Sequence, residues 1–105
     1  ALPAASSVAC SDAHTLVATE AGELLSWGGG GDGQLGHGDG ETCAAPRLVR
    51  ALAGIAVRAV ACGARHSIAL SADGAVFAWG SNLDGALGIG EGAAEEQLLP
   101  RRLPL

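Results

Sequence analysis

Short apolar runs alternate with turn-forming residues along most of this chain. The runs span residues 8–10, 15–18 and 23–27 in the first half and residues 59–62, 67–70 and 75–79 in the second. Glu20-Ala21-Gly22 and Ala72-Asp73-Gly74 separate the last two runs of each half. A short glycine-containing loop between two apolar runs is typical of a β-hairpin. The pattern therefore predicts three short antiparallel strands in each half.

Two further runs predict a fourth strand in each half. Residues 46–49 and 100–103 are apolar and basic and begin with proline, which is common in edge strands. The stretches before them, residues 29–40 and 81–92, are rich in glycine, and the entropy cost of so many glycines disfavours a helix there. Only residues 49–53 and 91–98 have a composition compatible with a helical turn.

The second half of the chain repeats the first. Cys10 and Cys62 stand 52 positions apart, and the same offset relates His14 and His66, Gly22 and Gly74, Trp27-Gly28 and Trp79-Gly80, Gly33 and Gly85, Leu35 and Leu87, and Gly36 and Gly88. The Pro-Arg pairs at 46 and 100 stand 54 positions apart, so the second copy carries two extra residues in the stretch 91–99.

A repeat of this length, with regular glycines and one tryptophan per unit, indicates a propeller or a solenoid. Four short antiparallel strands per unit favour a propeller blade. The sequence thus predicts an all-β fold of two four-stranded antiparallel blades, in residues 1–53 and 54–105. Repeat units bury their faces mainly against neighbours. We therefore expect self-association or further blades, through outward faces lined by Leu16, Leu24, Ile68 and Val76.

Charge and composition argue against several functions. The net charge is −5, and all six basic residues are arginine. Nucleic acid is an unfavourable partner, because phosphate binding needs clustered cations. The absence of lysine excludes a Schiff-base lysine and the lysine of a phosphate-binding loop. The sequence shows neither a secretory leader pattern nor an apolar run of membrane-spanning length, so we expect an intracellular protein, cytoplasmic or nuclear, without a membrane partner.

Two motifs resemble ligand sites, but the repeat explains them better. Gly31, Gly33 and Gly36 match a dinucleotide-binding fingerprint, but no helix is predicted after them to face a pyrophosphate. Cys10 and His14, with Cys62 and His66, offer four ligands of the types that bind zinc. The repeat places the two pairs on separate blades, whereas a structural zinc site converges on one point.

Two further clusters resemble a catalytic and a calcium site. Cys10, Asp12 and His14 could form a nucleophile, an orienting acid and a base, but the second copy has alanine at the position of Asp12. The acidic residues of the first glycine-rich stretch lack the ligand alternation of an EF-hand. We therefore expect no catalytic residue, no cofactor and no bound metal.

The second copy resembles a repeat of the regulator of chromosome condensation family. The resemblance rests on Gly63 and His66, on Gly74, on Trp79-Gly80 and on the Asp-Gly-x-Leu-Gly run at residues 84–88. Both copies show it, and together they make up nearly the whole chain. The first copy departs from the pattern at Ser11, where the second has glycine, at Ala13, and at Gly30.

The resemblance implies blades of a propeller that is seven-bladed in complete family members. These members include an exchange factor for a small GTPase, adaptors fused to ubiquitin ligases and a plant ultraviolet-B photoreceptor, and the fold alone does not choose between them. Ultraviolet sensing requires tryptophan in the turn before the histidine, where this chain has Ala13 and Ala64. We expect a non-enzymatic protein-interaction module. The alternatives are a guanine-nucleotide exchange factor for a small GTPase and the substrate-recruiting arm of a ubiquitin ligase.

The repeat also predicts which side chains are buried. We expect low accessibility where a residue lies against a blade face or under a glycine-rich loop, namely at Trp27, Trp79, Cys10, Cys62, Leu35 and Leu87. Cys43 has no counterpart in the second copy. We therefore expect its thiol to react first.

Overall fold

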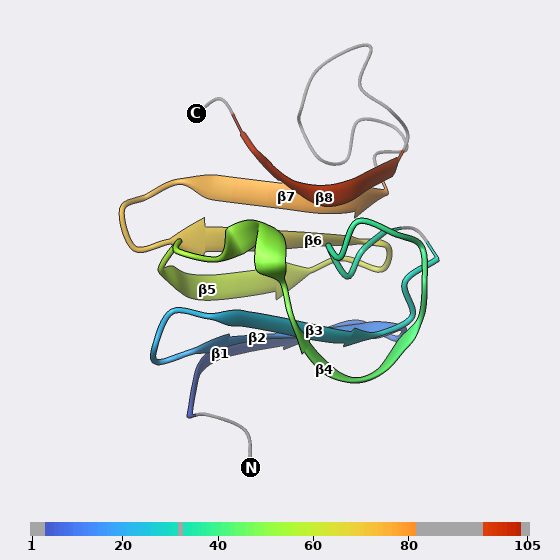
Figure 1. Cartoon of the computed structure of the whole chain (residues 1–105), viewed down its shortest axis with the longest axis horizontal. Helices are drawn as coiled ribbons and strands as arrows, with labels where there is room; N and C mark the ends of the chain where they lie inside the picture. Colours follow the sequence, from blue (N-terminus) through green and yellow to red (C-terminus); the bar gives the residue numbers. More distant parts are fainter. Residues whose placement is uncertain (1–3, 32, 82–95, 104–105) are drawn as a thin grey trace.

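Two antiparallel sheets make up the computed structural model, which describes residues 4–31, 33–81 and 96–103. The first contains β1 (Ala5–Cys10), β2 (His14–Thr19), β3 (Leu24–Gly28) and β4 (Cys43–Leu48), and the second contains β5 (Val57–Cys62), β6 (His66–Ser71), β7 (Val76–Ser81) and β8 (Glu96–Arg102). Each sheet has its strands in sequence order. Figure 1 shows the first sheet below the second. The predicted all-β fold with two four-stranded units is confirmed.

The strands pair in the same register within each of the two sheets. Leu16 pairs with Ser26 in the first, and Ile68 pairs with Ala78 in the second, at the predicted offset. The first strand pair of each sheet also shifts register at corresponding positions. Arg47 pairs with Ser26 and Arg101 with Ala78, so the fourth strands follow the larger offset of 54.

The fourth strands begin earlier than the sequence predicts. β4 starts at Cys43 and β8 at Glu96, so residues 96–98 are extended and not helical. The register of β4 on β3 shifts over the stretch that contains Pro46. Such an irregularity on an edge strand accommodates a residue without an N–H donor, so proline need not be the first strand residue.

The connection between the sheets contains the only other regular element of the described chain. This is the 3₁₀ helix η1 (Arg50–Leu52), within the stretch 49–53 whose composition suggested a helical turn. The blade boundary between residues 53 and 54 lies in the same connection and stays a prediction. No helix among the described residues is both long enough and apolar enough to cross a membrane.

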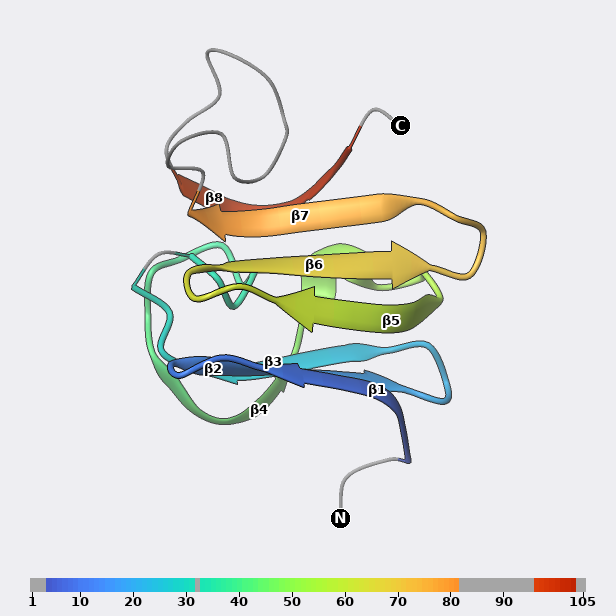
Figure 2. The ribbon, with the colours of Figure 1, turned by 180° about the vertical axis from the view of Figure 1, so that it is seen from behind.

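The hydrophobic core lies between the two sheets. Leu16 and Leu24 of the first blade are 0% and 2% exposed and join one buried cluster with Ala69 and Trp79 of the second. The expectation that Leu16 and Leu24 line an outward face is therefore wrong. Strand alternation identifies residues that share a face but not which face the neighbouring blade covers. Figure 2 shows β5 beside β1, and these strands contact each other.

Candidate interaction site

A chain of hydrogen bonds crosses between the blades. Nε2 of His14 lies 2.9 Å from the hydroxyl of Ser67, which donates to the carbonyl of Gln34 at 2.7 Å. The indole N–H of Trp79 donates to the same carbonyl at 2.8 Å. His14, Ser67 and Trp79 are all buried. Because the first blade supplies His14 and Gln34 and the second supplies Ser67 and Trp79, these bonds fix one blade against the other.

The hydrogen-bond partners determine the protonation of His14. The Ser67 hydroxyl donates its hydrogen to the carbonyl of Gln34, so its oxygen accepts from the Nε2–H of His14. The Ser11 hydroxyl accepts from the backbone N–H groups of Ala13 and His14, and it donates to Nδ1 of His14, 2.9 Å away. The imidazole is thus neutral. Burial lowers the pKa of His14 below its ordinary value of 6.5, in agreement with this assignment.

Three Ser–His contacts have the spacing of a nucleophile and its base. In the first, the Ser11 hydroxyl donates to Nδ1 of His14, but its lone pairs accept two backbone N–H groups, so the oxygen is not free to attack a substrate. Beside the His14–Ser67 pair, Nε2 of His37 lies 3.0 Å from the hydroxyl of Ser26. Ser26 donates its hydrogen to the carbonyl of Leu35, so it too accepts from an Nε2–H. A base must accept the hydroxyl proton, and Ser67 and Ser26 instead donate it to a backbone carbonyl. Both serines are also fully buried. None of the three contacts has the geometry of nucleophilic catalysis.

The first glycine-rich loop is held against the second blade. Gly36 has a φ of +76°, and a Cβ at this position would lie 2.8 Å from Nε1 of Trp79, so only glycine fits. Leu35 is buried, as predicted. The N–H of Gly38 donates to the carbonyl of Leu98 on β8 at 3.0 Å. No helix follows the loop glycines, which serve the contact between blades.

The remaining residues of the repeat signature occupy matching places in the two sheets. Gly22 and Gly74 lie in the hairpins. Gly28 and Gly80 pair with the histidines His14 and His66. Gly63 lies beneath the ring of His66. Gly33 of the first loop packs near Leu98. Gly85, Leu87 and Gly88 lie outside the described residues, so the predicted burial of Leu87 is not tested.

Two of the burial predictions fail for one shared reason, and a third is met only in part. Trp27 and Cys62 are only half-buried and Cys10 is exposed, whereas Trp79 is fully buried. Trp79 and Cys62 both face the first blade, and Cys62 packs against the buried core there without being fully covered. Trp27 and Cys10 lie on the opposite side of the first blade, where no described residue forms another sheet. Sequence equivalence therefore did not give equal burial.

The accessibilities of the thiols also reverse the expected order of reaction. Cys10 is exposed and Cys43 is half-buried, so Cys10 is the most accessible thiol. Burial, with a smaller contribution from the neighbouring Cys10, raises the pKa of Cys62 to about 11. The described residues include no group of three or more His, Cys, Asp or Glu side chains that could hold a metal ion. The structure does not gather the two Cys–His pairs into one site.

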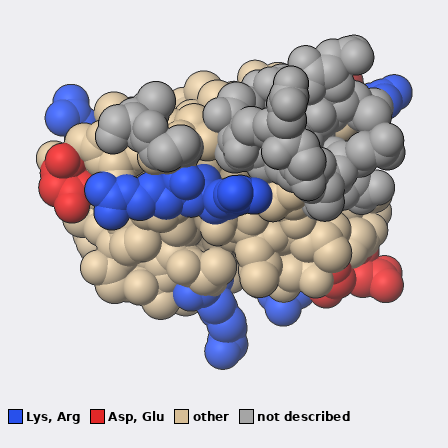
Figure 3. Space-filling view, turned by 90° about the horizontal axis from the view of Figure 1, so that it is seen from above, with Lys and Arg blue, Asp and Glu red and all other residues tan. Residues whose placement is uncertain are grey.

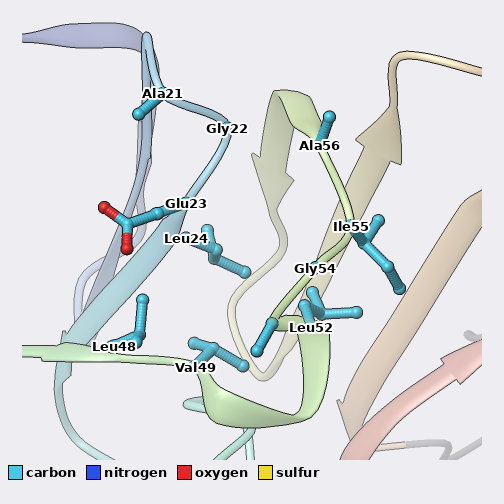
Figure 4. Close-up of a pocket in the computed structure, with 11 residues that line it drawn as sticks. Ala21, Gly22, Glu23, Leu24, Leu48, Val49, Leu52, Gly54, Ile55 and Ala56 are labelled. Carbon is cyan, nitrogen blue, oxygen red and sulfur yellow. The ribbon is translucent and has the colours of Figure 1, made fainter.

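A hollow of about 260 Å³ lies between the β2–β3 hairpin and the connection that contains η1. Figure 4 shows Leu24 and Val49 pointing into it, whereas the Glu23 carboxylate points away. Glu23 is the one ionisable residue of the described lining. The hollow thus offers apolar contact but no group of polar side chains that could orient a small substrate.

A second hollow, of about 330 Å³, carries positive charge. We name it the arginine-lined hollow, and its lining consists of Gly36, His37, Arg47, Leu48, Arg50, Ala51 and Leu99. Burial and then the Arg47 guanidinium lower the pKa of His37, while a backbone hydrogen bond at Ser26 and then the charge of Asp39 partly oppose them. The two arginines are exposed. The hollow therefore presents fixed positive charge to solvent.

Exposed leucine surface borders the arginine-lined hollow. Leu99, which helps to line it, is 51% exposed, and Leu98 beside it is 37% exposed. The same strand, β8, carries the exposed Arg101 and Arg102. Figure 3, a view from above, shows arginine atoms in a stripe across this side of the molecule. Cationic and apolar groups thus occur together here, which makes this surface the candidate interaction site.

Comparison with known proteins places both repeats in one family. The pattern of the Regulator of chromosome condensation (RCC1) repeat matches residues 21–70 and 73–105, and a second pattern of the same description matches residues 5–34 and 57–86. The chain is 41% identical over 96 residues to the ultraviolet-B receptor UVR8 of Arabidopsis thaliana. This match covers 91% of this chain and 21% of that protein.

Two further relatives have other functions. The chain is 41% identical over 99 residues to the human E3 ubiquitin-protein ligase HERC2, covering 91% of this chain and 2% of that protein. The crystal structure of Prp20p from Saccharomyces cerevisiae matches the fold with a TM-score of 0.85 at 24% identity, covering 100% of this chain and 27% of that one. The chain spans a small part of each. Since the repeat pattern covers most of the sequence and the two sheets repeat it in register, this chain belongs to the regulator of chromosome condensation (RCC1) repeat family.

Proposed function

We propose that this chain is a non-enzymatic protein-interaction module that binds an acidic, leucine-containing segment of a partner protein at the arginine-lined hollow. The observation that carries this proposal is the placement of Arg47 and Arg50 in one hollow with Leu99, beside the exposed Leu98. Guanidinium groups pair with carboxylates, and the leucines offer apolar surface that a partner can cover.

The geometry of the serines and histidines supports a role without catalysis. In the contacts of Ser67 with His14 and of Ser26 with His37, the serine hydrogen goes to a backbone carbonyl and not to the imidazole. The Ser11 hydroxyl donates to His14, but it accepts two backbone N–H groups, so its oxygen is not free to act as a nucleophile. A module that works by surface contact needs no such pair. An intracellular setting is part of this proposal and rests on the sequence pattern alone.

A small GTPase is the alternative partner. Prp20p is described with binding properties to Gsp1p and to histones. At 24% identity this likeness concerns the fold, and no residue of the arginine-lined hollow favours a GTPase over another acidic protein surface. Substrate recruitment for a ubiquitin ligase is a second alternative. HERC2 is an E3 ubiquitin-protein ligase, and the match with this chain covers 2% of its length.

The test uses a fluorescent peptide of alternating glutamate and leucine, with fluorescence anisotropy as the readout. We expect binding that weakens as salt rises, because screening reduces the attraction between exposed charges. The double variant Arg47→Ala with Arg50→Ala should weaken binding by about tenfold or more, which corresponds to about 1.4 kcal/mol. Arg58→Ala is the matched control, because Arg58 is exposed on β5 and outside the hollow. Equal binding by the double variant and the control would contradict the proposed site.

A further inference from the structure

Two guanidinium groups reach the arginine-lined hollow from neighbouring elements of the first copy. Arg47 belongs to β4, and Arg50 begins η1 just after that strand. In the described part of the chain, neither guanidinium forms an ion pair. Both side chains are exposed, so both are available to a ligand from solvent.

An imidazole lies on the same side of the first sheet as Arg47. Arg47 pairs with Ser26 in the register of β3 and β4, and the Ser26 hydroxyl contacts Nε2 of His37. Side chains of residues that pair directly across two strands lie on one face of the sheet. Burial and then the charge of Arg47 lower the pKa of His37, so this charge acts inside the hollow that both residues line.

The described acidic residues leave the two arginines unpaired. Asp39 acts electrostatically on His37, but it is outside the lining of the hollow, and its carboxylate accepts the backbone N–H of Glu41. The described lining contains no acidic side chain. Two guanidinium charges in one partly enclosed hollow repel each other. An anion that contacts both of them removes this repulsion.

A phosphate group matches the two charges better than a carboxylate does. A phosphorylated serine or threonine carries a charge of about −1.5 to −2 at pH 7 and has three strong acceptor oxygens. A guanidinium donates two parallel hydrogen bonds to a carboxylate or to a phosphate. The two oxygens of one carboxylate are thus used by a single guanidinium, whereas the oxygens and charge of one phosphate serve both.

We propose that the acidic group bound in the arginine-lined hollow is the phosphate of a phosphorylated serine or threonine in the partner's segment. This inference rests on the proposed function, because it names the chemistry of the segment at the same hollow. The volume of about 330 Å³ is at the lower end for ligand sites, which suits a single side chain. The exposed Leu98 and Leu99 offer apolar surface to a leucine beside the phosphorylated residue.

A protein segment fits this surface better than a nucleic acid. The net charge of −5 repels a polyanion that must lie along the molecule. The neighbouring leucines favour an apolar side chain over a charged sugar–phosphate backbone. The lining also comes from both copies of the repeat, with Arg47 and Arg50 from the first and Leu99 from the second. The hollow therefore accepts one charged group with an apolar neighbour.

The test uses three fluorescent peptides of alternating serine and leucine that differ only at the central position. This position is serine, glutamate or phosphoserine, and fluorescence anisotropy with the full chain gives the three dissociation constants. We expect the phosphoserine peptide to bind about tenfold more tightly than the glutamate peptide, because the phosphate accepts further charge-assisted hydrogen bonds. The serine peptide should bind most weakly.

Single variants separate the preference for phosphate from the affinity. Arg47→Ala and Arg50→Ala should each reduce the preference for phosphoserine over glutamate to about threefold or less, because one guanidinium remains to bind either group. Leu99→Ala should weaken both peptides by the same factor and keep the preference. Arg58→Ala should change neither, because Arg58 is exposed outside the hollow. Circular dichroism checks that each variant is folded.

The outcomes distinguish this inference from the proposed function. A preference for phosphoserine that is lost only in the arginine variants supports the phosphate site. Equal affinity for the glutamate and phosphoserine peptides, with both weakened in the double arginine variant, would overturn the phosphate inference and leave the acidic-segment proposal intact. Absence of binding by both peptides would overturn both. A thymidine oligonucleotide that binds as tightly as the phosphoserine peptide, with the same dependence on the arginines, would show an unselective polyanion surface and also overturn the inference.

Discussion

Equivalent residues of the two copies do different work. Ser67 joins His14 to Gln34 inside the contact between blades, whereas Thr15, its counterpart in the first copy, is half-buried and makes no side-chain hydrogen bond with the described residues. The repeat alone relates these two positions, but only the structure shows which of them is inside a contact. Their unequal surroundings give a matched pair of substitutions.

Ser67→Ala should destabilise the chain by about 1–3 kcal/mol, because it leaves the Nε2–H of His14 buried without an acceptor. Thr15→Ala should change stability by less than about 0.5 kcal/mol, as expected for a position without a buried partner. Urea unfolding followed by circular dichroism measures both, at the same low protein concentration in every sample. Equal losses for the two substitutions would show that the hydrogen bonds between blades do not stabilise the fold.

At the scale of strands and loops, the sequence was sufficient for the strand count and the offset between copies. Apolar runs and hairpin signals located β2, β3, β6 and β7, and the offset of 52 residues recurs in the strand register. The start of β4 was misplaced because an irregularity carries Pro46 inside the strand. The orientation of Leu16 was missed because alternation does not reveal which face meets the neighbouring blade.

The candidate site was less predictable than the fold. Arg47 and Arg50 follow the first glycine-rich loop, whereas Leu99 comes from the far end of the second copy. Their meeting depends on the loop packing against β8, through the bond from Gly38 to Leu98. No periodicity of the sequence encodes such a contact between copies.

The loop makes a sharp prediction about Gly36. Gly36→Ala should cost about 1–2 kcal/mol for the positive φ and about 1–3 kcal/mol more for overpacking, because its Cβ would lie 2.8 Å from Nε1 of Trp79. Gly74→Ala is the control: its φ is +93°, but no atom lies within 4 Å of the added Cβ. Urea unfolding should show a larger loss for Gly36→Ala, together with a change in tryptophan fluorescence. A loss no larger than that of Gly74→Ala would refute the role of the loop in seating Trp79.

At the scale of the whole molecule, the stability of the chain should depend on pH through the buried His14 and the half-buried His37. His14 joins the blades, and His37 ties the first loop to Ser26 of β3. The pKa of each is lowered in the folded chain, chiefly by burial. The unfolded chain therefore binds more protons than the folded one once the pH falls below about 6.5, the ordinary value. This part of the stability is complete above that pH and is lost as the pH falls toward the folded pKa values.

The expected result is a urea midpoint that decreases between pH 7.5 and pH 5, because the free energy of unfolding falls by at most about 1.4 kcal/mol per pH unit for each histidine. Asp73 does not interfere in this range, because Ser71 lowers its pKa below the ordinary value of 3.8. Its contribution is lost only in more acidic solution. The variant with His14→Gln and His37→Gln should be less stable at pH 7.5 but should show a flatter dependence on pH. A midpoint that stays constant or rises as the pH falls would mean that the two imidazoles are not held neutral by the fold.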